Sequence, residues 1–242
     1  MLVLLADVLP ALAIRGQFGL TDGQAWLASC GFAVAMVATC LIHEIGHAIV
    51  GRMIGLEPKV IRIFGLGAST EYSRYAVSPR EEALCAISGP LANILAAAIA
   101  AGLGFAVHRE DFATVVVVFC LINLGLVAVN LLPLYPHDGG QIIHAGYWLL
   151  LGSELTALRG TGFTAGILVT VCAGSAIYVA STGLLTLGLL LGFQAGYFAF
   201  VSIKAIPHRQ SMLATGALVA NFRGVFGESQ APAGVQSSAP TI

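Results

Sequence analysis

The sequence predicts an all-α polytopic membrane protein with about six transmembrane helices, and three observations support this class. Of the 242 residues, 57% are hydrophobic and only 10% are charged, whereas a soluble domain carries about 25% charged residues. The mean hydropathy is +0.89. The apolar residues are gathered into long segments, several of them about twenty residues or more, which is the length needed to cross a bilayer. The chain length suits one membrane-embedded domain.

The spans can be placed in order along the chain. A retained first span is expected from Met1 towards Phe18, because this segment lacks the basic start of a secretory signal. The other five are expected over about 24–53, 83–107, 113–132, 163–181 and 184–203, with a short helix over 141–151. We therefore expect residues 1–206 to form the membrane-embedded domain. Residues 207–242 are expected to form a polar, partly disordered tail, in which 212–226 is a weakly amphipathic segment.

A polar connection over about 55–82 follows the second span. It contains two β-prone runs, 59–64 and 70–75, separated by a glycine-containing turn, and this pattern is typical of a β-hairpin. Tyr72 and Tyr75 favour a position at the membrane interface, where tyrosine is common. We expect a small interfacial hairpin, with a plain surface loop as the alternative.

The basic residues are distributed unevenly between the two sides that six spans create. Nine of the eleven lysines and arginines fall on the side that carries both termini and the loops after spans two and four. The positive-inside rule makes that side cytoplasmic. The net charge of −1, without any basic run, excludes nucleic acid as an expected partner.

The second span carries the sequence His43-Glu44-Ile45-Gly46-His47 near its cytoplasmic end. Two histidines four residues apart lie on one face of a helix, so both imidazoles can reach one Zn²⁺. Glu44, next to the first histidine, could take a proton from a water molecule at the metal. Ionisable groups at membrane depth are costly and usually functional. The motif therefore predicts a zinc hydrolase whose site lies inside the bilayer.

A catalytic zinc needs a third protein ligand as well as an open position. The candidates are Asp138, His137, His144, Glu154 and Glu57. Asp138 is the strongest, because it follows a helix end broken by two prolines and precedes two glycines that permit a tight turn. The alternative for Asp138 is a capping role at the start of the next helix.

Three ordered motifs carry a family resemblance: H-E-x-x-H at 43–47, G-P-x-x-N at 89–93, and N-x-x-P-x-x-x-x-D-G at 130–139. Over about 25–140 this pattern resembles the catalytic core of the site-2 protease family of intramembrane zinc metalloproteases. The chain looks like a minimal form, without the PDZ or CBS modules that some branches carry.

The resemblance implies that His43, His47 and Asp138 bind one Zn²⁺ per chain and that Glu44 is the general base. It thereby identifies the chain as a zinc metalloendopeptidase. The alternatives left open are a membrane metal-binding or transport protein that uses the same cluster without hydrolysis, and a different H-E-x-x-H protease with Glu154 as the third ligand.

The same resemblance implies roles for three further residues. Asn93 is similar to an asparagine thought to hold the substrate backbone or the oxyanion, and Asn130 resembles the polar anchor of its motif. His137 departs from the family, which usually has an apolar residue before Asp-Gly, so it could compete for the metal or act from behind the ligands.

The substrate that the resemblance implies is a transmembrane protein, cleaved within or near its membrane segment in regulated intramembrane proteolysis. The backbone carbonyls of a substrate helix are hydrogen-bonded within the helix, so the helix would have to unwind locally before cleavage. Pairing of the unwound segment with the strand expected at 70–75 would expose the peptide bond. The protein is expected in the cell membrane, embedded in the lipid bilayer with its site opening to the cytoplasm. A regulatory membrane partner is compatible with this interpretation as an intramembrane protease.

Overall fold

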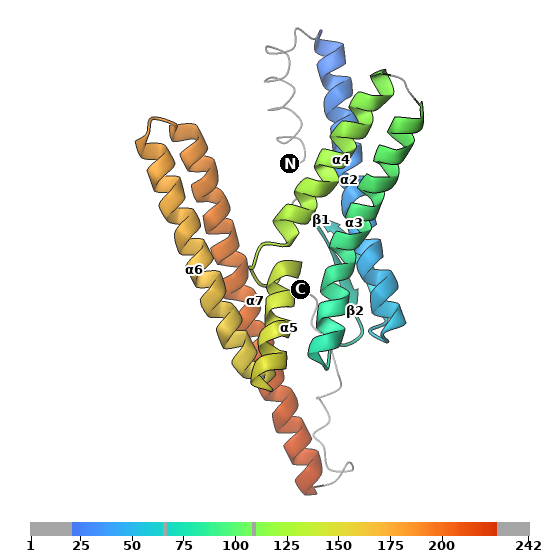
Figure 1. Cartoon of the computed structure of the whole chain (residues 1–242). Coiled ribbons are helices and arrows are strands. Elements are labelled where there is room, and N and C mark those ends of the chain that lie inside the picture. Colours follow the sequence, from blue (N-terminus) through green and yellow to red (C-terminus); the bar gives the residue numbers. More distant parts are fainter. Residues whose placement is uncertain (1–20, 65–66, 108–109, 227–242) are drawn as a thin grey trace. The chain divides into compact units, whose positions relative to one another are not determined.

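The computed structural model describes residues 21–64, 67–107 and 110–226. Within these ranges the chain forms six helices and one two-stranded antiparallel sheet, which confirms the all-α class with a small hairpin (Figure 1). The helices and strands, in chain order, are α2 (Asp22–Met53), β1 (Pro58–Phe64), β2 (Gly67–Tyr72), α3 (Pro79–Val107), α4 (Glu110–Asn130), α5 (Asp138–Leu151), α6 (Glu154–Ser181) and α7 (Leu185–Phe226). The expected first span lies outside the described residues.

The chain divides into two compact units, which we describe separately. The first contains the chain up to Tyr75 together with Ile87–Asn130, and the second contains Ala76–Ala86 together with the chain from Leu131. Helix α3 contributes its first turns to the second unit and the rest of its length to the first.

In the first unit, α2 starts at a capping box. The Thr21 hydroxyl accepts a hydrogen bond from the backbone N–H of Gln24, and the Gln24 side chain accepts one from the backbone N–H of Thr21. This arrangement satisfies two of the backbone donors that a helix start leaves open. The helix ends just after the H-E-x-x-H motif, and the chain turns at Gly55, whose φ of +80° suits glycine.

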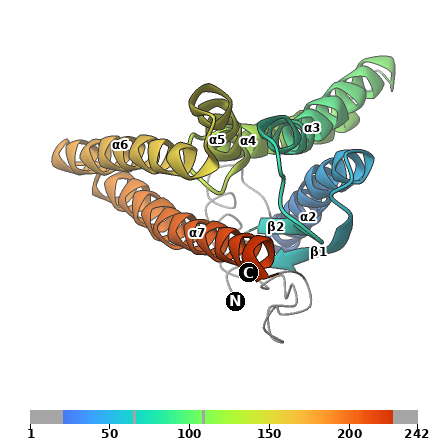
Figure 2. The same ribbon diagram turned by 90° about the horizontal axis from the view of Figure 1, so that it is seen from below.

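Strands β1 and β2 lie against α2 in the first unit (Figure 2). In their antiparallel register Ile61 lies opposite Thr70 and Ile63 lies opposite Ala68. On the other face, Arg62 and Glu71 form an exposed ion pair. The hairpin therefore presents one face to α2 and carries charge on the other.

In the second unit, α6 and α7 lie side by side, and α5 packs against α6 (Figure 1). Gly188 of α7 allows the close approach, because a Cβ there would lie 2.6 Å from Cβ of Ala180. The connection before α5 is folded tightly onto the first turn of that helix. A Cβ on Gly139 or Gly140 would overlap backbone atoms of this connection.

Two predicted boundaries in the second unit are wrong. Helix α6 begins at Glu154, nine residues before the expected 163, because the Ser153 hydroxyl accepts a hydrogen bond from the N–H of Thr156 and caps the helix. The last span was expected to end at about 203, but α7 continues to Phe226 with Pro207 inside it, where the proline cannot donate a backbone hydrogen bond. The segment 212–226 is therefore part of this helix.

Four helices in the described part of the chain are long and apolar enough to cross a membrane: α2, α3, α4 over Phe112–Asn130, and α6. They match four of the predicted spans, and the span expected at 184–203 forms the first half of α7. Large apolar side chains point outward from these helices, such as Leu27, Phe105 and Phe163. Outward-facing residues of this kind are typical of a lipid-facing surface.

Candidate metal centre

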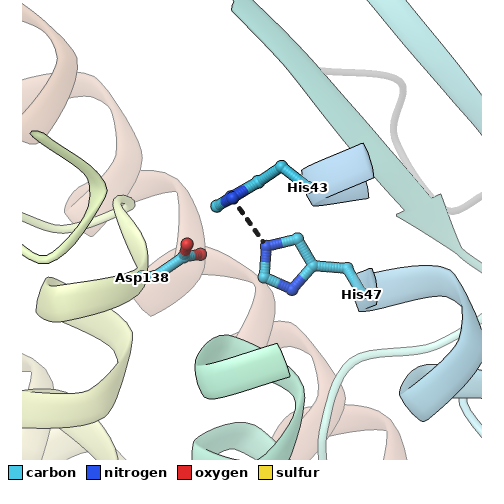
Figure 3. A group of neighbouring side chains, drawn as sticks. All are labelled: His43, His47 and Asp138. Carbon is cyan, nitrogen blue, oxygen red and sulfur yellow. Dashed lines mark hydrogen bonds between the residues drawn. The ribbon is translucent and has the colours of Figure 1, made fainter. Parts of the chain in front are cut away.

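His43 and His47 lie one turn apart on α2, and both are buried. Their Nε2 atoms face each other at 3.1 Å, with the rings nearly perpendicular (Figure 3). Two nitrogens bound to one tetrahedral Zn²⁺ at about 2.0–2.1 Å lie about 3.3 Å apart. The two imidazoles therefore fit as neighbouring ligands of a single zinc ion.

The other ring nitrogens are held by helix α3. Nδ1 of His43 lies 2.7 Å from Oδ1 of Asn93, and Nδ1 of His47 lies 3.3 Å from the Ser88 hydroxyl. Because an amide oxygen only accepts hydrogen bonds, Nδ1 of His43 carries the proton and Nε2 keeps its lone pair. Partners of this kind fix the tautomer and the ring orientation of metal-binding histidines.

Asn93 is completely buried and its amide is fixed by further hydrogen bonds. Nδ2 donates to the backbone oxygen of Thr39 at 3.1 Å and to Oδ1 of Asn123 at 2.8 Å. Asn123 in turn donates to the Thr39 hydroxyl at 3.2 Å. This network joins α2, α3 and α4 behind His43.

The family resemblance implied that Asn93 holds the substrate backbone or the oxyanion, and it assigned no role to Asn123. It missed Thr39 and Ser88 altogether. A signal existed for Thr39, which lies four residues before His43 and therefore on the same helix face.

Two glycines allow the close contact of α2 and α3 around the imidazoles. A Cβ on Gly46 would lie 2.7 Å from both Cβ of Ala92 and the backbone oxygen of Ser88. A Cβ on Gly89 would overlap Nε2 of His47 and would lie 2.8 Å from Cε1 of His43. Gly89, the glycine of the G-P-x-x-N motif, therefore leaves free the space that the ring atoms of His43 and His47 occupy.

Glu44 is only 6% exposed and points to the hairpin. Its Oε2 accepts a hydrogen bond from the Thr70 hydroxyl on β2 at 2.7 Å. Thr70 thus holds the candidate base, although its sequence pattern predicted only a place in a β-strand.

Asp138 belongs to the second unit, where it is the first residue of α5 and is buried. The expectation that it could cap this helix is wrong, because the capping position is occupied by His137. His137 is half-buried, and its Nδ1 lies 3.2 Å from the Leu134 carbonyl. Burial lowers the pKa of His137 below its usual value, although that carbonyl and the carboxylate of Asp138 act in the opposite direction.

Asn130 is the last residue of α4, in the first unit. Its Nδ2 donates to the Leu126 carbonyl of the preceding turn at 3.1 Å. This bond lies within one helix and leaves the amide oxygen of Asn130 as an acceptor for other groups.

The other third-ligand candidates have different surroundings. His144 is completely buried, with Nδ1 2.8 Å from a carboxylate oxygen of Glu82. The carboxylate of Glu154 accepts hydrogen bonds from Arg209 at 2.9 and 2.5 Å. Glu57 lies on the exposed turn after α2.

Residues 31–109 match the model of peptidase family M50. The Mycobacterium tuberculosis protein Rip3, named as a candidate zinc metalloprotease, is 28% identical over 204 residues, which is 82% of this chain and 50% of that protein. Stage IV sporulation protein FB of Bacillus subtilis is 31% identical over 158 residues, 64% of this chain and 50% of that protein. The chain thus spans about half the length of these relatives.

Among solved structures, the site-2 protease from Methanocaldococcus jannaschii has a similar fold, with a TM-score of 0.53. The similarity covers 84% of this chain and 88% of that one, at 17% sequence identity. At this identity the likeness concerns the fold alone.

Proposed function

Because the chain belongs to the site-2 protease family and is an integral membrane protein, we propose that it is a zinc metalloprotease that hydrolyses peptide bonds within or near the transmembrane segments of membrane proteins. The observation that carries the proposal is the pair His43 and His47, with facing Nε2 atoms 3.1 Å apart and Glu44 beside them. The alternative of metal binding or transport without hydrolysis gives no reason for a buried carboxylate next to this pair.

The proposed metal ligands are His43, His47 and Asp138, which have suitable donor atoms for one ion and are all buried (Figure 3). Two imidazoles and one carboxylate are a common ligand set for catalytic zinc. When bound, zinc supplies a Lewis acid that polarises a carbonyl group and lowers the pKa of water.

The chain's own residues would perform the proton transfers. Glu44 takes the proton of the attacking water and later delivers it to the leaving amine, as a general base and then a general acid. Asn93 holds Nδ1–H of His43, so that Nε2 is directed to the metal. Because the amide groups of Asn93 already bond to the protein, we assign contact with the substrate to Asn130, and we assign His137 a position behind Asp138.

A transmembrane substrate must expose its backbone before it can be hydrolysed. Each strand of the two-stranded sheet pairs with its neighbour along one edge. We propose that an unwound substrate segment adds to β2 as a further strand, with main-chain hydrogen bonds holding the scissile bond near Glu44. A regulated cleavage, with access controlled by a membrane partner, is compatible with this mode.

We further propose the topology indicated by the basic residues, in which the site opens to the cytoplasm of a cell membrane. Residues 1–206 would form the membrane domain, with the catalytic core at about 25–140, and 207–242 a cytoplasmic tail. Labelling of single cysteines placed in the hairpin and in α7 with a membrane-impermeant reagent would test this orientation. Labelling of intact cells from outside would contradict it.

The decisive experiment is Glu44→Gln, co-expressed with candidate single-span membrane proteins. The variant should fold, keep its zinc and lose cleavage, because glutamine preserves the shape of the side chain but cannot accept the proton. Persistent cleavage by this variant would show that Glu44 is not the base. Zinc that survives Asp138→Ala but is lost in Glu154→Ala would overturn the assignment of the third ligand.

A further inference from the structure

Thr70 of β2 touches the candidate base directly. Its hydroxyl lies 2.7 Å from Oε2 of Glu44 and 3.3 Å from the backbone oxygen of the same residue. A hydroxyl has one hydrogen to donate, and the shorter distance identifies the carboxylate as its acceptor. A bond to a carboxylate is shorter and stronger than one between neutral groups.

The pairing of the two strands fixes the position of Thr70. Thr70 pairs with Ile61 in the antiparallel register and is half-buried. Its β-branched side chain has restricted rotamers. Two residues further on, Tyr72 lies on the same face of the strand.

Tyr72 provides a second contact between β2 and α2. A Cβ on Gly51 would lie 2.5 Å from the Tyr72 ring, so the ring packs directly against the helix backbone. Gly51 and Glu44 are seven residues apart, which places both on one face of α2. Strand and helix are therefore held together at two points, and one of these points is the base itself.

We propose that Thr70 is a positioning residue, whose hydroxyl holds the Glu44 carboxylate in the orientation needed for proton transfer. This inference rests on the proposed function. It also deepens that function, because the strand proposed to receive the substrate is the same strand that orients the base. A substrate segment that adds to β2 would then lie beside a base that the same strand already orients.

The test compares Thr70→Val with Thr70→Ser in the full-length protein, using cleavage of a purified single-span substrate. Valine keeps the shape and the strand preference but removes the donor, whereas serine keeps the donor. Since a small misplacement of a catalytic group can cost about 100-fold in rate, Thr70→Val should lower kcat by about 10–100-fold. KM and bound zinc should stay unchanged, and Thr70→Ser should recover most of the rate.

Ser69→Ala is the matched control, because it removes a hydroxyl from the neighbouring position on the opposite face of β2. This control should cleave at the wild-type rate. If valine prevents folding, Thr70→Ala removes the same hydroxyl and has the same expected result.

Three results would overturn the inference. They are a wild-type rate for Thr70→Val, an equally slow Thr70→Ser, and loss of zinc in Thr70→Val together with the loss of rate. None of these results would affect the proposed function if Glu44→Gln is inactive. Cleavage by Glu44→Gln would instead remove the proposed function whatever Thr70 does.

Discussion

The two units each bury a histidine with a short hydrogen bond, but the partners differ in kind. In the first unit Nδ1 of His43 bonds to the neutral amide of Asn93 at 2.7 Å. In the second, Nδ1 of His144 bonds to the carboxylate of Glu82 at 2.8 Å. Nε2 of His43 faces another imidazole nitrogen, whereas Nε2 of His144 lies 3.5 Å from the Glu154 carbonyl.

This difference decides what each histidine can do. A ring that faces an amide oxygen on one side keeps a lone pair on the other side, and that lone pair can bind a metal. A ring that faces oxygen acceptors on both sides donates to both only when each nitrogen carries a proton. His43 is therefore suited to be a ligand, and His144 is suited to hold helices together.

Two carboxylates show the same contrast. The buried Glu44 accepts a hydrogen bond from the neutral hydroxyl of Thr70. Glu154 forms an ion pair with Arg209. The base at the candidate metal centre therefore has a neutral hydrogen-bond partner, whereas Glu154 has a charged one.

The largest effect should separate the two histidines. His43→Ala should abolish zinc binding and cleavage, because a zinc site with one of three ligands removed loses its coordination. His144→Ala should keep zinc while lowering thermal stability. Metal content of the purified variants, measured by atomic emission, checks both. Full zinc occupancy in His43→Ala would contradict the ligand assignment.

Removal of the charged partner in the second unit should reduce stability. Glu82 and His144 are both nearly inaccessible to solvent, and breaking a buried pair by removing one member costs about 3–5 kcal/mol. Glu82→Ala should therefore lower the free energy of unfolding by about this amount. A double-mutant cycle with His144→Ala isolates the contribution of the pair. Additive losses in the cycle would show that the two residues do not stabilise each other.

The neutral partner in the first unit should have a smaller effect, of a different kind. Asn93→Ala should weaken zinc binding by about 10–100-fold, which is typical for the loss of a residue that orients a metal ligand. Competition with a zinc chelator measures the change. Asn130→Ala is the control, since the Asn130 amide donates within its own helix. Equal zinc affinity in the two variants would remove the role assigned to Asn93.

The sequence was sufficient to locate four membrane-length helices and the hairpin, because apolar segments of this length and alternating β-prone runs are local patterns. It did not predict where α6 begins or where α7 ends. The sequence also located His43, Glu44 and His47, whose spacing is local to one helix. It did not predict the partners of these residues. Ser88 and Thr70 lie 41 and 26 residues from the side chains they contact, and such contacts depend on how helices and strands pack.

The ion pair of Glu154 could not be predicted from the sequence for the same reason. Its carboxylate contacts Arg209, 55 residues away. The packing of α6 against α7 brings these two residues together, and sequence distance gives no hint of that choice. The carboxylate partner of His144 is likewise distant, 62 residues away in the sequence.

The close contact between α2 and α3 is made with residues that weaken helices. Gly46 allows α3 to approach α2, Gly89 provides the space for the imidazoles, and Pro90 follows inside α3. In a water-exposed helix interior a glycine costs about 1 kcal/mol and a proline about 3 kcal/mol relative to alanine. In a bilayer an unwound segment would expose backbone groups that have no water to bind, so the helix persists despite these residues. The bilayer therefore stabilises helices that contain these glycines and this proline. The same segments would be less stable as helices in water, and the two histidines would then be less well positioned to bind a metal ion.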